Sequence, residues 1–256
     1  LLSEVPEGYA SAITKEADKD TLNYWFRPKL EVDSLVFEMT HKQTIDTTVV
    51  KIKDFKSDSL VFKSLSSTLK LKESFQINAT IPLDSLDASK VRIMDKDSVF
   101  QSPTMVLDRF SNTVDFNFEK TEENNYAIEM LPGTFTDFYG AKNDTLNFKA
   151  TTKLRSSYGD VRIEIRNGVY PLIVELVDAK GMVVESSLSL EVSPVDFNEV
   201  TPGIYFLRVI FDSNQNGVYD SGDYLKKIQP ERVSYALEPV EVRAGWDTIE
   251  EFILED

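Results

Sequence analysis

In the stretch Thr113-Val114-Asp115-Phe116-Asn117-Phe118-Glu119, polar and apolar side chains alternate without a break. Successive side chains of a β-strand point to opposite faces, so this alternation buries one face and leaves the other in water. The same pattern recurs at 74–79, 145–150 and 161–166, and turn residues punctuate such runs at intervals of about 8–12 residues, as in sandwiches. The periodicity therefore predicts an all-β protein made of tandem antiparallel β-sandwiches.

Three blocks follow from the spacing of these runs. Residues 1–71 are expected to form a partial or small β domain, with strands at 22–27, 34–39, 48–53 and 59–62. Residues 72–152 and 153–256 are each expected to form a sandwich. Helical turns are expected only near 10–17 and 85–90. No linker of low complexity separates the blocks, so the joints are expected to be short.

The composition argues against several classes of function. With 28 basic and 43 acidic residues, the net charge is −15, which repels phosphate backbones, so no nucleic-acid partner is expected. Without cysteine there is no thiolate metal site or cysteine nucleophile, and His41 is the single histidine. A Gly-x-Ser-x-Gly elbow and a Gly-x-Gly phosphate loop are both missing from the sequence. The chain is therefore predicted not to be an enzyme.

The chain carries no apolar run of the roughly 20 residues that span a bilayer, so no membrane span is expected. It begins with Leu1-Leu2-Ser3-Glu4, which has neither an initiator Met nor the pattern of a signal peptide. The start is therefore expected to be trimmed, with any targeting segment removed.

The second block resembles the bacterial Ig-like domain of S-layer proteins, which is common in surface proteins of Bacteroidetes. The resemblance rests on the alternating run 75–81, the run 89–93, the turn Leu131-Pro132-Gly133 followed by Thr136, Asp137 and Gly140, and the closing run 144–148. In that family the domain is a spacer or interaction module. The resemblance therefore implies no catalytic residues.

The third block is similar to the prealbumin-like sandwich of carboxypeptidase regulatory domains and adhesin B-type repeats. The similar phrases are 170–181 and 197–209, in which a Pro202-Gly203 turn leads into an alternating strand. Adhesin repeats often carry a lysine-to-asparagine cross-link between their first and last strands. Here the run 161–165 has no lysine and the run 248–253 has no asparagine, so that bond is not expected.

The order of these blocks is similar to that of uncharacterised Ig-like domain proteins of Bacteroidetes, many of them predicted lipoproteins. The resemblance implies an exported protein of the cell envelope, at the outer-membrane surface or in the periplasm. It implies other envelope proteins or surface glycans as partners, and possible anchoring through an N-terminal lipid that this sequence lacks. The expected function is that of a non-catalytic structural or interaction module.

One segment points to specific chemistry, the run Asp-Ser-Asn-Gln-Asn-Gly-Val-Tyr-Asp-Ser-Gly-Asp at 212–223. Its oxygen-bearing side chains and its glycine have the spacing of a calcium-binding loop. The expected ligands are the side chains of Asp212, Asn214, Asn216, Asp220 and Asp223 and the carbonyl of Val218. The preceding run 204–211 is strand-like, so the loop is expected to connect sandwich strands. Two amide ligands and a short final Asp predict weak Ca²⁺ binding, with Kd roughly 10⁻⁴ to 10⁻³ M.

Three alternatives remain open at this point. The 212–223 loop can be a polar hairpin whose side chains bond their own backbone and need no ion. Trp25, Trp246 and the tyrosines can form a stacking platform in a glycan-binding module of a polysaccharide-uptake system, although core packing is the commoner role of such residues. The abundant carboxylates also leave room for a hydrolase, if two of them face each other across a cleft.

Overall fold

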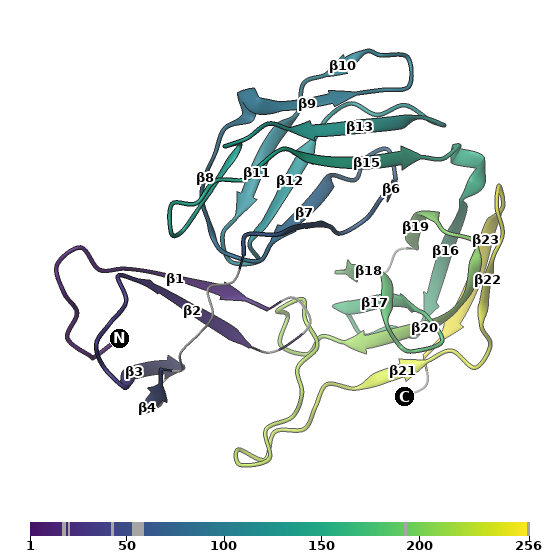
Figure 1. Cartoon of the computed structure of the whole chain (residues 1–256). Helices are drawn as coiled ribbons and strands as arrows, with labels where there is room; N and C mark the ends of the chain where they lie inside the picture. Colours follow the sequence, from purple (N-terminus) through teal and green to yellow (C-terminus); the bar gives the residue numbers. More distant parts are fainter. Residues whose placement is uncertain (17–18, 20, 42–43, 53–58, 192–193, 255–256) are drawn as a thin grey trace. The chain divides into compact units, whose positions relative to one another are not determined.

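The computed structural model describes residues 1–16, 19, 21–41, 44–52, 59–191 and 194–254 (Figure 1). The chain divides into two compact units, unit 1 at residues 1–152 and unit 2 at residues 153–256. Strands dominate both units, and the described residues include only two short 3₁₀ turns, η1 (Ala88–Lys90) and η2 (Arg155–Ser157). The all-β prediction is confirmed. Among the described residues no helix is long and apolar enough to cross a membrane.

Unit 1 is built around two sheets packed as a sandwich. One sheet has the strand order β10-β9-β13-β15-β6 and the other β11-β12-β7-β5. The pairings are antiparallel except that of β15 with β6, which is parallel. The strands are β5 (Phe62–Ser64), β6 (Thr68–Leu69), β7 (Phe75–Ala79), β9 (Val91–Met94), β10 (Phe100–Gln101), β11 (Thr104–Asp108), β12 (Thr113–Asn117), β13 (Asn125–Met130) and β15 (Leu146–Thr152). A separate pair joins β8 (Leu83–Leu86) to β14 (Phe135–Asp137).

The core of this sandwich consists of the inward-facing apolar side chains of the alternating strands. From one sheet come Phe75, Ile77 and Phe116, and from the other Ile93 and Ile128, all at most 1% exposed. Burying an aromatic or aliphatic side chain of this size stabilises the fold by roughly 1.5–3 kcal/mol each. The period-two pattern in the sequence thus corresponds directly to the two inner faces of the sandwich.

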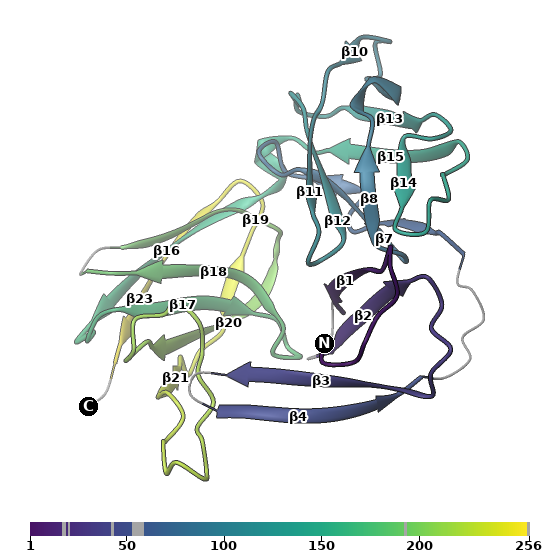
Figure 2. The ribbon, with the colours of Figure 1, turned by 90° about the vertical axis from the view of Figure 1, so that its left-hand side faces the viewer.

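Two further strand pairs of unit 1 precede the sandwich in the chain. β1 (Ala10–Lys15) pairs with β2 (Leu22–Arg27), and β3 (Ser34–His41) pairs with β4 (Thr44–Lys51), both antiparallel. Figure 2 shows the second hairpin as a long two-stranded ribbon. The first hairpin is tied to the sandwich because Lys15 N donates to Phe110 O over 2.7 Å and the Arg27 guanidinium lies 4.8 Å from the centre of the Phe138 ring.

The structure departs from the sequence-based expectation at two places in unit 1. The segment near 10–17 is not helical: residues 10–15 form strand β1, because Trp25 Nε1 donates to Thr14 Oγ1 and the β1–β2 register buries Thr14. The sandwich also begins before residue 72, since β5 pairs with β7 and Phe62 and Leu69 belong to its core. Ala17 and Lys53, at the ends of two expected segments, lie outside the described residues.

Unit 2 has a second pair of sheets. One has the order β19-β16-β23, in which β16 and β23 are parallel, and the other has the order β18-β17-β20-β21 with β22 also paired to β20. The strands are β16 (Gly159–Arg166), β17 (Leu172–Val177), β18 (Val183–Ser189), β19 (Val195–Val200), β20 (Gly203–Phe211), β21 (Val233–Tyr235), β22 (Val240–Val242) and β23 (Asp247–Ile253). Their inward residues, including Ile163, Leu172, Leu176 and Val209, form a second, separate core.

A buried hydroxyl in unit 2 gives a prediction about stability. Tyr170 Oη is buried and has no hydrogen-bond partner among the described residues, and burial raises the pKa of this phenol. A buried polar group without a partner destabilises the folded state by about 1–3 kcal/mol. We therefore expect Tyr170→Phe to raise the free energy of unfolding of unit 2 by up to about 1 kcal/mol in urea denaturation.

Tyr205→Phe is the matched control for this change. Tyr205 Oη donates to Thr201 O over 2.7 Å, and Tyr205 is buried in the same core. Removal of this hydroxyl should lower the free energy of unfolding by about 1 kcal/mol. Two substitutions of the same chemistry are thus expected to act in opposite directions, and a loss of stability in Tyr170→Phe would contradict the prediction.

Candidate cation-binding loop

The Asp/Asn-rich segment lies in the long connection between β20 and β21, which projects from unit 2 as the yellow-green excursion in Figure 1. Asp212 is the first residue after β20, and its backbone N–H donates to Pro171 O over 3.2 Å. Its side chain is only 1% exposed. A strand frame therefore supports the start of the loop, in agreement with the expectation from the 204–211 run.

Asp212 organises the first half of the loop. Its Oδ1 accepts a hydrogen bond from Asn216 N over 3.0 Å, and its Oδ2 accepts one from Gly217 N over 2.8 Å. Gly217 has φ +75°, a left-handed conformation that glycine adopts without steric penalty. The sharp turn thus places two backbone N–H groups within hydrogen-bond distance of one buried carboxylate, and these bonds stabilise its negative charge.

Asn214, Asn216 and Asp220 form the second part of the cluster. The side-chain amides of both asparagines donate to Asp220 Oδ2, the bond from Asn216 Nδ2 spanning 2.6 Å. Their own Oδ1 atoms accept backbone hydrogen bonds, from Asn216 N over 3.1 Å for Asn214 and from Val218 N over 2.9 Å for Asn216. Four of the expected ligand side chains, including that of Asp212, are therefore gathered within one hydrogen-bonded network.

Glu231 is a functional candidate that lies outside the 212–223 motif. It is 8% exposed, and its Oε1 accepts from Ser213 N over 2.8 Å while its Oε2 accepts from Asp220 N over 3.1 Å. One carboxylate therefore joins the two ends of the 213–220 segment. The sequence contains only a weak sign of this role, an acidic residue after Pro230 that is separated from the motif.

Asp223 is not brought together with the other expected ligands. Its Oδ1 accepts from Lys226 N over 3.0 Å, and its Oδ2 pairs with Lys226 Nζ over 2.9 Å. These bonds lower the pKa of the Asp223 carboxyl. Backbone bonds in both directions between Asp223 and Ile228 close a small hairpin, so position 223 belongs to that hairpin and not to the Asp212 network.

The donor chemistry of the network suits a hard cation. A carboxylate oxygen or an amide oxygen that accepts one N–H bond retains a second lone pair, and this applies to both Asp212 oxygens and to both asparagine Oδ1 atoms. In the described part of the chain, no three His, Cys, Asp or Glu side chains are grouped as a metal centre. Carboxylates alone thus do not form the site, and a bound ion would also require the amide oxygens and the Val218 carbonyl.

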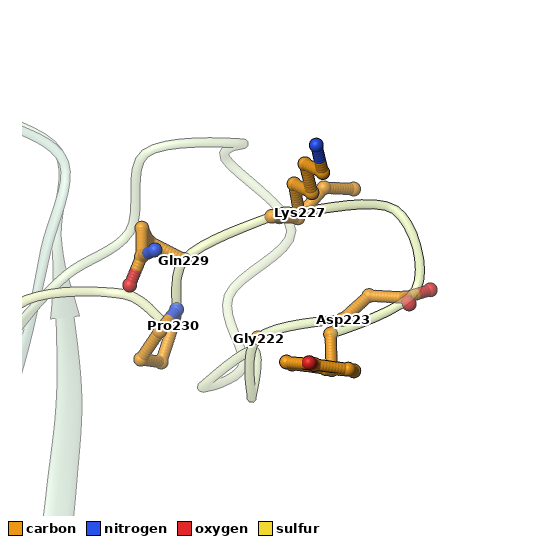
Figure 3. A pocket seen from close by; sticks show the side chains of 7 residues that line it. Gly222, Asp223, Lys227, Gln229 and Pro230 are labelled. Atoms are coloured by element: carbon orange, nitrogen blue, oxygen red, sulfur yellow. The ribbon is translucent and has the colours of Figure 1, made fainter.

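The surface hollow beside the small hairpin has two charged side chains, which do not face each other as an acid and a base acting together would (Figure 3). It is lined by Gly222, Asp223, Lys227 and Pro230 together with neighbouring residues of the hairpin. In Figure 3 the side chains of Asp223 and Lys227 extend away from each other. The hollow therefore presents no acid–base pair to a substrate.

The buried carboxylates of the described residues have structural partners. They are Asp137, Glu175, Asp212 and Glu231. Asp137 Oδ1 accepts from the backbone of Tyr139 and Ala141, and Glu175 pairs with Arg208 over 2.5 Å. A glycosidase needs two carboxyl groups that face the scissile bond, and these four groups are engaged in holding the backbone or an arginine.

The aromatic side chains do not form an exposed platform in the described structure. Trp25 is half-buried, whereas Trp246 is 60% exposed with the Arg243 guanidinium 5.3 Å from its ring centre. Ring pairs lie instead in half-buried positions, such as Tyr9 with Phe26, or in the buried core, such as Phe75 with Phe116. No ring pair among the described residues joins two exposed aromatic side chains.

The chain shows distant similarities to known proteins. No protein-family model matches the chain. A segment of 157 residues, 58% of the chain, is 28% identical to polyribonucleotide nucleotidyltransferases of Aster yellows witches'-broom phytoplasma (strain AYWB) and Onion yellows phytoplasma (strain OY-M). The chain spans 22% of the length of these curated relatives.

Three solved structures are similar to this chain with TM-scores no higher than 0.36. The N-terminal part of the bacterial S-layer protein SbsC is 14% identical, with a TM-score of 0.36, and the match covers 60% of this chain and 41% of that one. The TIE protein of Bacillus anthracis is 11% identical (TM-score 0.25, covering 78% and 41%). BcpA, the major pilin subunit of Bacillus cereus, is 13% identical (TM-score 0.25, covering 99% and 82%).

Proposed function

We propose that this chain is a non-catalytic structural or interaction module of a bacterial cell-envelope protein, and that Ca²⁺ stiffens the loop between β20 and β21. The observation that carries the proposal is the network of Asp212, Asn214, Asn216 and Asp220, held at both ends by Glu231. A cation there would neutralise the two loop carboxylates and replace the amide bonds to Asp220 with contacts to amide oxygens. The ion would therefore order the loop and would take no part in a reaction.

The expected calcium affinity of the loop indicates in which compartment the site would be filled. Two of its side-chain ligands are neutral amides, and such sites fall in the range of extracellular modules, roughly 10⁻⁴ to 10⁻³ M. A site this weak fills only where calcium is abundant, as outside the cytoplasm. This agrees with an exported protein whose partners are other envelope proteins or surface glycans. An RNA partner is not proposed, because a net charge of −15 repels phosphate.

The test is thermal unfolding of the full chain after chelation, with and without added calcium. Calcium at about ten times its Kd stabilises the folded state by about 1.4 kcal/mol. For a unit of roughly 100 residues, each kcal/mol raises the melting temperature by about 4–8 °C. We therefore expect an increase of several degrees in unit 2, followed through the fluorescence of Trp246 in a Trp25→Phe background.

Two single-residue variants distinguish calcium binding at the loop from nonspecific stabilisation of an acidic protein by calcium. Asp220→Asn removes the carboxylate at the centre of the network and should abolish the calcium-dependent increase. Asp223→Asn removes the same charge from the adjacent hairpin, outside the network, and should retain the increase. No shift at millimolar calcium in the unmodified chain, or an equal loss in both variants, would refute calcium binding at this loop. Magnesium serves as the control for ionic strength.

A further inference from the structure

Two four-residue segments of the chain are identical, and both contain an Asn-Gly pair. Asn-Gly-Val-Tyr occurs at 167–170, between β16 and β17, and at 216–219, inside the Asp/Asn loop. An Asn-Gly pair can lose ammonia spontaneously, since glycine has no Cβ to prevent its backbone nitrogen from reaching the preceding side-chain carbonyl. Because the local sequences are identical, a difference in reactivity between the two sites must come from the folded structure.

At the second segment the reacting groups are held by hydrogen bonds. Gly217 N, the atom that would attack, donates to Asp212 Oδ2 over 2.8 Å. The Asn216 side chain is fixed at both ends, its Oδ1 by Val218 N over 2.9 Å and its Nδ2 by Asp220 Oδ2 over 2.6 Å. The attacking nitrogen must first lose its proton, and the buried negative charge of Asp212 disfavours a second negative charge beside it.

At the first segment the same groups are unrestrained. The Asn167 side chain is exposed, and among the described residues neither that side chain nor Gly168 N has a hydrogen-bond partner. Asn167 has φ 59°, a left-handed conformation that asparagine adopts more readily than most residues but that still carries strain. Turning out of this conformation therefore breaks no hydrogen bond of the Asn167 side chain or of Gly168 N, whereas the equivalent motion at Asn216 breaks three.

We propose that Asn167 is a deamidation site of this protein and that the Asp212 network protects Asn216. At Asn167, Gly168 N gives its proton to solvent base and forms a bond to the Asn167 side-chain carbon. The amide C–N bond then breaks, and its nitrogen takes a proton from solvent and leaves as ammonia. The cyclic imide then takes up one water and opens to aspartate or isoaspartate. The product adds one negative charge to the β16–β17 loop, and the isoaspartate form also lengthens the backbone there by one methylene.

The test is incubation of the full chain with a chelator at mildly alkaline pH, followed by peptide mapping by mass spectrometry. We expect Asn167 to convert at least about tenfold faster than Asn216, a factor equivalent to about 1.4 kcal/mol in the barrier. In denaturant the two identical segments should convert at similar rates. Equal rates in the folded protein, or faster conversion of Asn216, would overturn the proposal. The chelator makes this result independent of calcium binding.

A variant identifies the protecting group. Asp212→Asn removes the carboxylate that accepts from Gly217 N, so conversion at Asn216 should accelerate severalfold while conversion at Asn167 stays constant. Because Asp212 is buried, the Trp246 melting curve must show that unit 2 of the variant is folded under the incubation conditions. If it is unfolded, the unmodified chain with and without denaturant still decides the question.

Discussion

Replacing Phe116 with alanine is expected to lower the free energy of unfolding of unit 1 by about 3–5 kcal/mol. Phe116 is 0% exposed, and its ring centre lies 5.8 Å from that of Phe75 in the core of the sandwich. Truncation removes buried apolar surface and leaves a cavity that a close-packed interior fills only in part. A loss of this size is a large fraction of the stability of a single domain.

Phe100→Ala is the control for this prediction. Phe100 lies on β10 of the same sandwich but is 68% exposed, so its truncation should change stability by less than about 0.5 kcal/mol. Urea denaturation followed by circular dichroism measures both variants. The Trp246 fluorescence transition of unit 2, in the Trp25→Phe background, should remain unchanged because unit 2 has a core of its own. Equal losses of stability in the two variants would contradict the placement of Phe116 in the core and of Phe100 at the surface.

Asn112→Ala is expected to destabilise unit 1 by about 3–4 kcal/mol, although the residue is polar and small. Asn112 is 5% exposed, and its side chain makes three hydrogen bonds to backbone. Its Nδ2 donates to Ala79 O over 2.7 Å and to Ile81 O over 2.8 Å, and its Oδ1 accepts from Leu83 N over 3.0 Å. Alanine leaves these buried groups without a partner, each at a net loss of about 1 kcal/mol.

The backbone conformation contributes the remainder. Asn112 has φ 54°, a left-handed conformation that asparagine tolerates and alanine does not. Asn112→Gly removes the same hydrogen bonds but has no Cβ, so it should be more stable than Asn112→Ala by about 1 kcal/mol. The comparison of the two variants by urea denaturation separates the lost hydrogen bonds from the strain. If both variants retain the stability of the unmodified chain, the three bonds do not hold the β7–β8 connection.

The strands were the most predictable part of this protein. The expected run 22–27 coincides with β2, and the alternating run 113–119 contains β12 (Thr113–Asn117). These predictions succeed because buried and exposed side chains alternate along a half-buried strand, so its apolar and polar residues alternate with a period of two. The helical expectation near 10–17 is wrong for residues 10–15, because the burial of Thr14 depends on its partner strand and the periodicity of the segment does not contain that information.

The candidate site was predictable in part. Asp212, Asn214, Asn216 and Asp220 gather as their spacing indicated, because a glycine-assisted turn brings side chains a few residues apart onto one centre. Asp223 follows the same spacing, but it forms an ion pair with Lys226 within the small 223–228 hairpin. Glu231 closes the loop from outside the motif, which no local spacing could indicate.

By itself, the sequence determined the all-β class, the strand faces and the oxygen-rich loop, since each of these depends on residues close together along the chain. Only the tertiary structure decided which strands pair, including the parallel pairs of β6 with β15 and β16 with β23. It also placed Glu231 against the loop and hydrogen-bonded one of two identical Asn-Gly-Val-Tyr segments while leaving the other unrestrained. The physical reason is that strand pairing and the position of Glu231 depend on residues distant in sequence. The hydrogen bonds around Gly217 depend on how the loop folds around it, so identical local sequences have different environments.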